Sequence, residues 1–103
     1  HKLNKEEGKI DWSETAEVIE RKIRAMNPWP CAYSNCQDMQ IKILEAKSHD
    51  QEHNFAPGAI MRKESMIACG KGLLEVKLIQ KPGKKAMSFA EFLRGMPNLE
   101  KMN

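Results

Sequence analysis

Long apolar runs, cysteine pairs and aromatic residues are all scarce in this chain of 103 residues. No apolar run approaches the roughly 20 residues that a membrane-spanning helix requires, so we expect no membrane partner. Three cysteines are an odd number, which excludes complete pairing in internal disulfides and favours reduced thiols in a cytoplasmic protein. No basic-then-apolar signal segment opens the sequence. A soluble globular domain is the class that these absences favour.

Residues arranged for catalysis are also few. His1 lies in a polar segment, and His49 and His53 share one polar loop, so no histidine pairs obviously with a nucleophile. Most carboxylates alternate with lysine or arginine, as on solvated faces. Gly70-Lys71-Gly72 lacks the full glycine-lysine-hydroxyl pattern of a phosphate-binding loop, and we interpret it as a turn. We therefore predict no catalytic residue in this chain.

The chain begins with a charged segment, and a helical pattern follows it. Residues 1–11 hold too few apolar residues to pack alone, and we interpret them as a linker that leads into a domain of residues 12–103. Apolar residues then recur at helical intervals, which predicts a helix from about residue 13 to 26, with Asp11 or Ser13 as its cap. Pro28 ends this helix because it disfavours the helical conformation at the residue before it.

Beyond the helix, the apolar period changes to two and predicts short strands. The expected strands lie at residues 32–36, 39–46, 59–63, 66–69 and 73–80, with a polar loop at 48–54 and a hairpin turn at 70–72. Ser88 and Glu91 form a capping box that opens a short helix, which Gly95 closes. Parallel strands would need crossovers of a dozen or more residues, so this spacing favours a small barrel. We predict a mainly β fold, a five- to six-stranded barrel of oligonucleotide-binding type with an N-terminal helix and a short C-terminal helix.

One set of four residues resembles a metal-binding motif. Cys31, Cys36, His49 and His53 have the ligand spacing of a small zinc finger. Such a finger places both histidines on one helix, whereas here the spacer alternates like a strand and the histidines follow in a polar loop. We therefore interpret the cysteines as incidental and the loop as solvated, with zinc as the alternative.

Four segments, taken in order, resemble the C-terminal domain of methionyl-tRNA formyltransferases: KLNKEEGKIDW, IRAMNPWP, FAPGAI and ACGKGLLEVKLIQKPGKKAM. The resemblance covers nearly the whole chain, although the position after PWP, often glycine in that family, is Cys31 here. It implies a barrel of oligonucleotide-binding type joined to an N-terminal catalytic domain of Rossmann-like fold. It also implies that the complete enzyme moves a formyl group from 10-formyltetrahydrofolate to the methionine of initiator methionyl-tRNA. The catalytic centre and the folate pocket would belong to the other domain, so no cofactor is expected in this part.

The role that the resemblance leaves to this domain is positioning of the tRNA. The formal net charge of +3 permits a polyanionic partner, and basic side chains neutralise phosphates without reading sequence. The candidate contacts are Lys2, Lys5, Arg24, Lys71, Lys81, Lys84 and Lys85, for each of which a solvated or internally paired charge is the alternative. Trp12 and Trp29 could stack on bases, but we interpret both as packing anchors.

Two other functions fit the same sequence. The chain could belong to another folate-dependent formyltransferase that acts on a nucleotide-sugar, or it could be an autonomous nucleic-acid-binding barrel.

Overall fold

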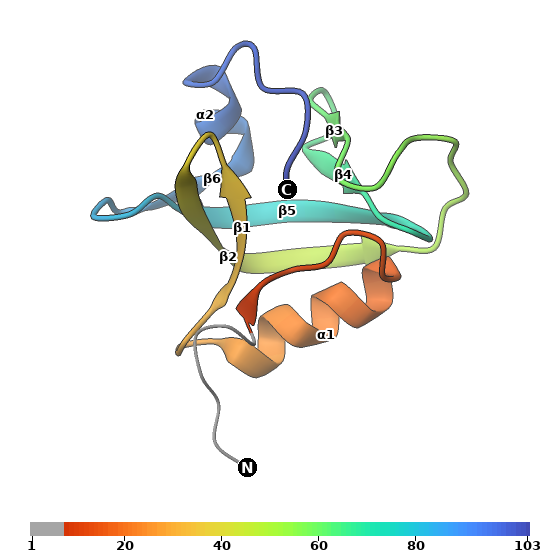
Figure 1. Cartoon of the computed structure of the whole chain (residues 1–103), viewed down its shortest axis with the longest axis horizontal. Helices are drawn as coiled ribbons and strands as arrows, with labels where there is room; N and C mark the ends of the chain where they lie inside the picture. Colours follow the sequence, from red (N-terminus) through yellow and green to blue (C-terminus); the bar gives the residue numbers. More distant parts are fainter. Residues whose placement is uncertain (1–7) are drawn as a thin grey trace.

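Two helices and six strands make up residues 8–103, which are the residues that the structure, a computed structural model, describes (Figure 1). In chain order the elements are α1 (Ala16–Met26), β1 (Ala32–Cys36), β2 (Met39–His49), β3 (Ile60–Met61), β4 (Met66–Ala68), β5 (Leu73–Gln80), β6 (Ala86–Ser88) and α2 (Phe89–Arg94). The candidate contacts Lys2 and Lys5 lie outside the described residues. No helix of the described residues is long and apolar enough to cross a membrane.

All strand pairs are antiparallel and form one sheet in the order β1-β2-β5-β4-β3, with β6 paired to β5 beyond this path. The prediction of a mainly β fold with two flanking helices is confirmed. Within residues 8–103, however, the outer strands β1 and β3 do not pair with each other, so hydrogen bonds do not close the sheet into a barrel.

The first helix starts later than its sequence pattern predicts. Thr15 is the cap of α1, because its side-chain oxygen accepts a hydrogen bond from the Val18 backbone N–H at 3.2 Å. Asp11 instead accepts two hydrogen bonds from Ser13, from the backbone N–H at 3.0 Å and from the hydroxyl at 2.6 Å. Asp11 therefore shapes the turn before the helix, and the prediction that Asp11 or Ser13 caps it is wrong.

The second strand is longer than predicted, because part of the expected polar loop is paired. Lys47, Ser48 and His49 continue the ladder opposite Glu75, Leu74 and Leu73 of β5. The prediction that the loop begins at residue 48 is wrong. The short C-terminal helix is confirmed: Ser88 accepts from the Glu91 backbone N–H at 3.1 Å, and Gly95 is its C-cap.

The core lies between α1, the sheet and α2. Helix α1 runs along β2 and covers the sheet with its apolar stripe, whose members Ala16, Ile19, Ile23 and Met26 are all buried (Figure 1). The three cysteines are buried as well, and Cys69 is fully buried in the core.

The N-terminal end of the described chain also packs on the domain. Ile10 is buried, and its N–H donates to the Tyr33 carbonyl at 2.8 Å. Trp12 is buried and donates its indole N–H to the buried hydroxyl of Ser34 at 3.0 Å, so its prediction as a packing anchor is confirmed. Residues 8–11, assigned to the linker by composition, therefore contact the folded domain.

Candidate nucleic-acid interface

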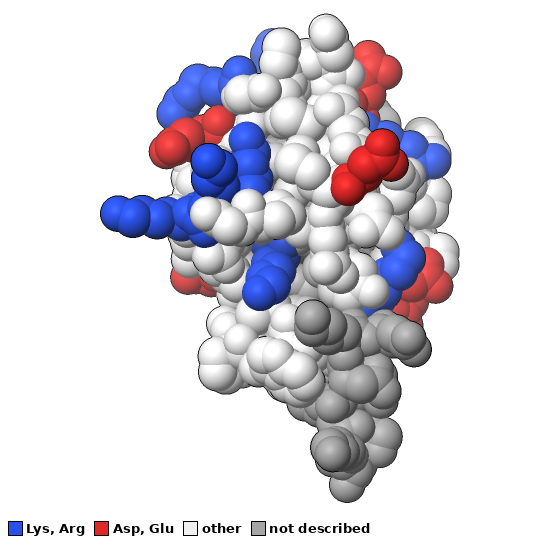
Figure 2. Space-filling view, turned by 60° about the vertical axis from the view of Figure 1, so that its left-hand side comes forward, with Lys and Arg blue, Asp and Glu red and all other residues white. Residues whose placement is uncertain are grey.

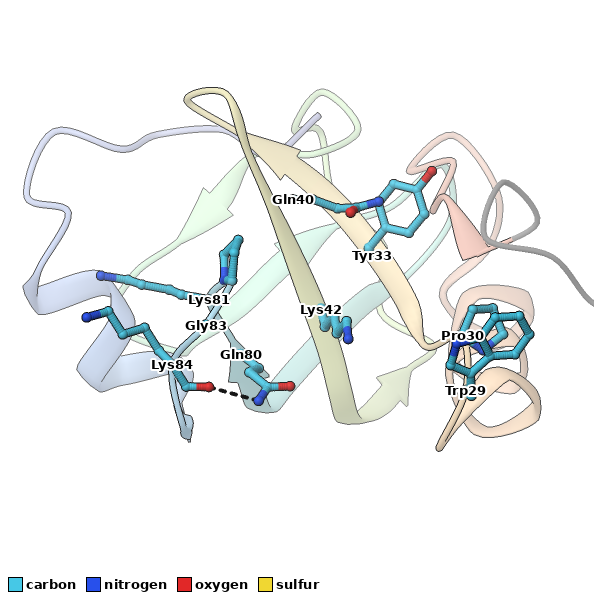
Figure 3. A pocket seen from close by; sticks show the side chains of 10 residues that line it. Trp29, Pro30, Tyr33, Gln40, Lys42, Gln80, Lys81, Gly83 and Lys84 are labelled. Carbon is cyan, nitrogen blue, oxygen red and sulfur yellow. Dashed lines mark hydrogen bonds between the residues drawn. The ribbon is translucent and has the colours of Figure 1, made fainter.

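A groove of about 290 Å³ crosses one side of the sheet and combines aromatic with basic side chains. Its lining residues are Trp29, Pro30, Tyr33, Gln40, Lys42, Gln80, Lys81, Pro82, Gly83 and Lys84. They come from the loop between α1 and β1, from strands β1, β2 and β5, and from the turn between β5 and β6. We call this feature the aromatic-basic groove (Figure 3).

The aromatic end of the groove is Trp29. This residue lies in the loop between α1 and β1, in which the Asn27–Pro28 and Trp29–Pro30 peptide bonds are both cis. Its side chain is 58% exposed, whereas the other tryptophan is buried. The prediction that Trp29 is a packing anchor is therefore wrong, because its ring faces solvent at the groove.

The middle of the groove is supplied by two strands. On β2, Lys42 is exposed between Ile41 and Ile43, which are both buried, because neighbouring side chains of a strand point to opposite faces. Tyr33 on β1 is half-buried and lies opposite Lys42 in the antiparallel ladder. The alternation that builds the core therefore also places Lys42 and Tyr33 together on the groove face.

The basic end of the groove is the turn between β5 and β6. Gln80 donates its side-chain amide to the Lys84 carbonyl at 2.8 Å, and the Lys84 N–H donates to the Lys81 carbonyl at 3.1 Å (Figure 3). The ammonium of Lys81 lies 5.8 Å from the centre of the Phe92 ring, within the range of a cation–π contact. The two hydrogen bonds order the turn that carries Lys81 and Lys84, and the cation–π contact directs the Lys81 ammonium toward α2 at this end of the groove.

The electrostatics of the groove favour an anion. Of the ten lining residues, three are lysines and none is an aspartate or glutamate. Several Lys and Arg side chains gather on the side of the molecule that carries the β5–β6 turn, with Asp and Glu side chains near the edges of this face (Figure 2). Closely spaced cations without interleaved carboxylates attract phosphate groups.

The structure brings together only some of the basic residues proposed from the sequence. Lys81 and Lys84 share the groove, and Lys85 is exposed in the same turn but does not line it. Arg24 binds the Glu20 carboxylate through a 2.6 Å hydrogen bond, which raises the pKa of the guanidinium. Lys71 lines a separate hollow of about 160 Å³ beside α1.

The four residues of the zinc motif have other partners. His49 Nε2 lies 2.8 Å from the Glu75 carboxylate, and His53 donates from Nε2 to the Cys69 carbonyl at 2.9 Å. Burial raises the pKa of the Cys36 thiol. Cys31 is buried, and its thiol donates to the Pro28 carbonyl at 3.0 Å. Across residues 8–103, no three His, Cys, Asp or Glu side chains are grouped so that they could hold a metal ion.

Sequence reasoning missed Trp29, Tyr33 and Lys42 as members of one site. Lys42 was readable as an outward-facing residue of a strand, but nothing in the pattern shows what lies beside it. Trp29 carried a stronger signal, because it stands between two prolines and outside the apolar periodicity of both neighbouring elements. A tryptophan that belongs to no apolar stripe is a candidate for surface recognition.

Comparison with known proteins gives consistent results for sequence and fold. The sequence profile of the family described as "Formyl transferase, C-terminal domain" matches residues 2–97. Methionyl-tRNA formyltransferases from Rickettsia bellii and Rickettsia felis are each 54% identical to the chain over 95 residues, which is 92% of this chain and 31% of each relative. The chain thus spans about a third of the length of the curated relatives that it matches.

Solved structures of HypX from Aquifex aeolicus share the fold. A multiple-substitution variant superposes with a TM-score of 0.75 at 17% identity, over 97% of this chain and 19% of that chain. A complex with tetrahydrofolic acid gives a TM-score of 0.73 at 18% identity, over 94% of this chain and 18% of that chain.

Proposed function

Because the chain belongs to the formyl transferase C-terminal domain family, we propose that it is the tRNA-docking domain of a methionyl-tRNA formyltransferase. The complete enzyme would transfer a formyl group from 10-formyltetrahydrofolate to methionyl-tRNA on an N-terminal catalytic domain. The aromatic-basic groove is the observation that carries the docking role, because it gathers three lysines without a carboxylate.

The mechanism that we propose is binding of the tRNA backbone without reading its sequence. The ammonium groups of Lys42, Lys81 and Lys84 neutralise phosphates and release the counterions that surround them. Affinity gained in this way orients the acceptor end toward the catalytic domain and reduces the entropic cost of the reaction. Identity of the initiator tRNA is then read elsewhere in the enzyme.

The docking role is tested by binding of this chain to initiator tRNA and to an elongator tRNA across a salt series. We expect micromolar or weaker binding that fades as salt rises and differs little between the two tRNAs. Strong discrimination would mean that the domain reads identity itself. Absence of binding to both at low salt would contradict docking and favour a formyltransferase that acts on a nucleotide-sugar.

No residue of this chain is assigned to the formyl transfer itself. Cys69 is a nucleophile in principle, but it is buried and burial raises the pKa of its thiol to about 12, so it stays protonated and enclosed at neutral pH. We expect no formyl transfer to methionyl-tRNA by the chain alone. Measurable transfer by the purified chain would contradict this assignment of roles.

A further inference from the structure

Trp29 is the feature that backbone docking leaves unexplained. A large aromatic side chain that is 58% exposed has apolar surface in water, and the lysines of the groove need no aromatic side chain to bind phosphate. The exposed Phe55, by comparison, stacks on His53 with ring centres 5.9 Å apart. Trp29 instead presents its ring at the edge of a groove.

The side chains along the groove change from aromatic at one end to basic at the other. This order suits a base at the aromatic end and its phosphates at the basic end. Trp29 and Pro30 lie at one end, Lys81 and Lys84 lie at the other, and Lys42 lies between them (Figure 3). Proteins that bind single strands combine aromatic platforms for bases with a basic track for phosphates.

We propose that the aromatic-basic groove binds an unpaired nucleotide of the tRNA, with the base stacked on Trp29 and the phosphates on Lys42, Lys81 and Lys84. This inference rests on the proposed docking function and extends it from the backbone to a base. Stacking accepts every base because each has a π face, so the groove selects single-stranded over paired segments and not one base over another.

The size of the groove agrees with a single base. Its volume of about 290 Å³ is at the lower limit of small-molecule sites, which span roughly 300–1,000 Å³. A base inside a duplex has its faces covered by its neighbours, so only an unpaired base offers a face to Trp29.

The test compares a single-stranded hexauridylate with an abasic oligonucleotide of the same length and charge. The wild-type chain should bind hexauridylate about tenfold more tightly than the abasic strand at low salt, because stacking of one base on an aromatic side chain is of that size or larger. Trp29→Leu should bind both strands alike, at the wild-type affinity for the abasic strand. Trp29→Phe should restore part of the preference.

Phe55→Leu is the matched control, because it removes an aromatic side chain that is similarly exposed, at 53%, and does not line the groove. This variant should keep the full preference for hexauridylate. Circular dichroism of each variant checks that the fold is intact, which is expected since both side chains are exposed.

The outcomes separate this inference from the docking function. Equal binding of the two strands by the wild-type chain, or an unchanged preference in Trp29→Leu, would overturn the stacking site even if tRNA binds normally. A Trp29-dependent preference for hexauridylate together with no binding of tRNA would support the stacking site and contradict docking.

Discussion

At the scale of single residues, Cys31 occupies a position that suits glycine. Its φ of 74° lies in the left-handed region, where a side chain costs roughly 1–2 kcal/mol. The buried thiol offsets part of this cost through its contact with the Pro28 carbonyl. The resemblance indicated glycine after PWP, and the turn that glycine would serve is present here with a cysteine in it.

We expect Cys31→Ala to be less stable than Cys31→Gly by about 1 kcal/mol, because alanine keeps the backbone strain and loses the thiol, whereas glycine removes the strain. Urea unfolding of the two variants measures the difference. Equal midpoints would show that the left-handed conformation carries no cost at this site.

Gly70 is a second residue whose role depends on one close approach. An added Cβ would lie 1.8 Å from the Ser13 carbonyl oxygen, and the Gly70 N–H already donates to the carbonyls of Trp12 and Glu14. We expect Gly70→Ala to lower the free energy of unfolding by about 3 kcal/mol, since backbone atoms must move. Gly95→Ala is the control, because its Cβ would meet only the Phe92 carbonyl oxygen at 3.5 Å. Thermal unfolding that shows equal losses for both would contradict this explanation.

At the scale of elements, Arg62 ties the end of β3 to the end of α2. Its guanidinium donates to the carbonyls of Leu93 at 2.5 Å, Leu99 at 2.8 Å and Met96 at 3.1 Å. These carbonyls lie at or beyond the C-terminus of the helix, where partners are scarce and a positive charge is favourable. The short helix α2 is thus held by an arginine from the turn that follows β3.

Substitution of Arg62 tests whether its hydrogen bonds hold α2 in place. Arg62→Met should lower the free energy of unfolding by about 2–3 kcal/mol, because it leaves carbonyls without a charged donor. Hydrogen exchange of the α2 amides should accelerate more than that of β5. Arg94→Met removes an exposed charge from the same helix and should change stability by less than about 0.5 kcal/mol. Similar losses of stability in the two variants would show that Arg62 does not hold α2 in place.

A second link between elements joins β2 to β5 and is sensitive to pH. The hydrogen bond from His49, aided by Lys77 and Lys47, holds the pKa of the Glu75 carboxyl below its usual value. The resulting stabilisation is present at pH values above the ordinary carboxyl range and is lost as the pH falls through the lowered pKa. We expect wild type to exceed Glu75→Gln in urea midpoint at pH 6 and the gap to close near pH 3. A gap that is constant with pH would exclude Glu75 as its source.

The elements themselves were largely predictable from local patterns. Periodicity of 3.6 and of 2 indicated α1, β1, β2 and β5, and the Ser88 capping box located α2, because these signals are properties of neighbouring residues. The cap of α1 was not predictable from spacing alone, since Asp11 and Thr15 both precede an apolar stripe. The extension of β2 into polar residues was hidden because pairing with β5, not apolarity, orders Ser48 and His49.

At the scale of the whole molecule, the groove forms only when the chain folds. Trp29, Lys42 and Lys84 are far apart in sequence, and the β1-β2-β5 order of the sheet brings their elements side by side. Of the seven basic residues predicted from the sequence as tRNA contacts, Lys81 and Lys84 line the groove. Lys42 also lines the groove but was not predicted as a contact. Sequence alone gave the sign of the charge but not its distribution over the surface.

The most direct measurement is the salt dependence of tRNA binding by two triple variants of equal charge. The first variant changes Lys81, Lys84 and Lys85 to Gln. The second changes to Gln three exposed lysines that do not line the groove, namely Lys47, Lys63 and Lys101. We expect only the first to weaken binding, with a slope of log affinity against log salt that flattens by about one for each lost phosphate contact. Unchanged affinity and slope in the first variant, or equal losses in both, would contradict docking through this turn.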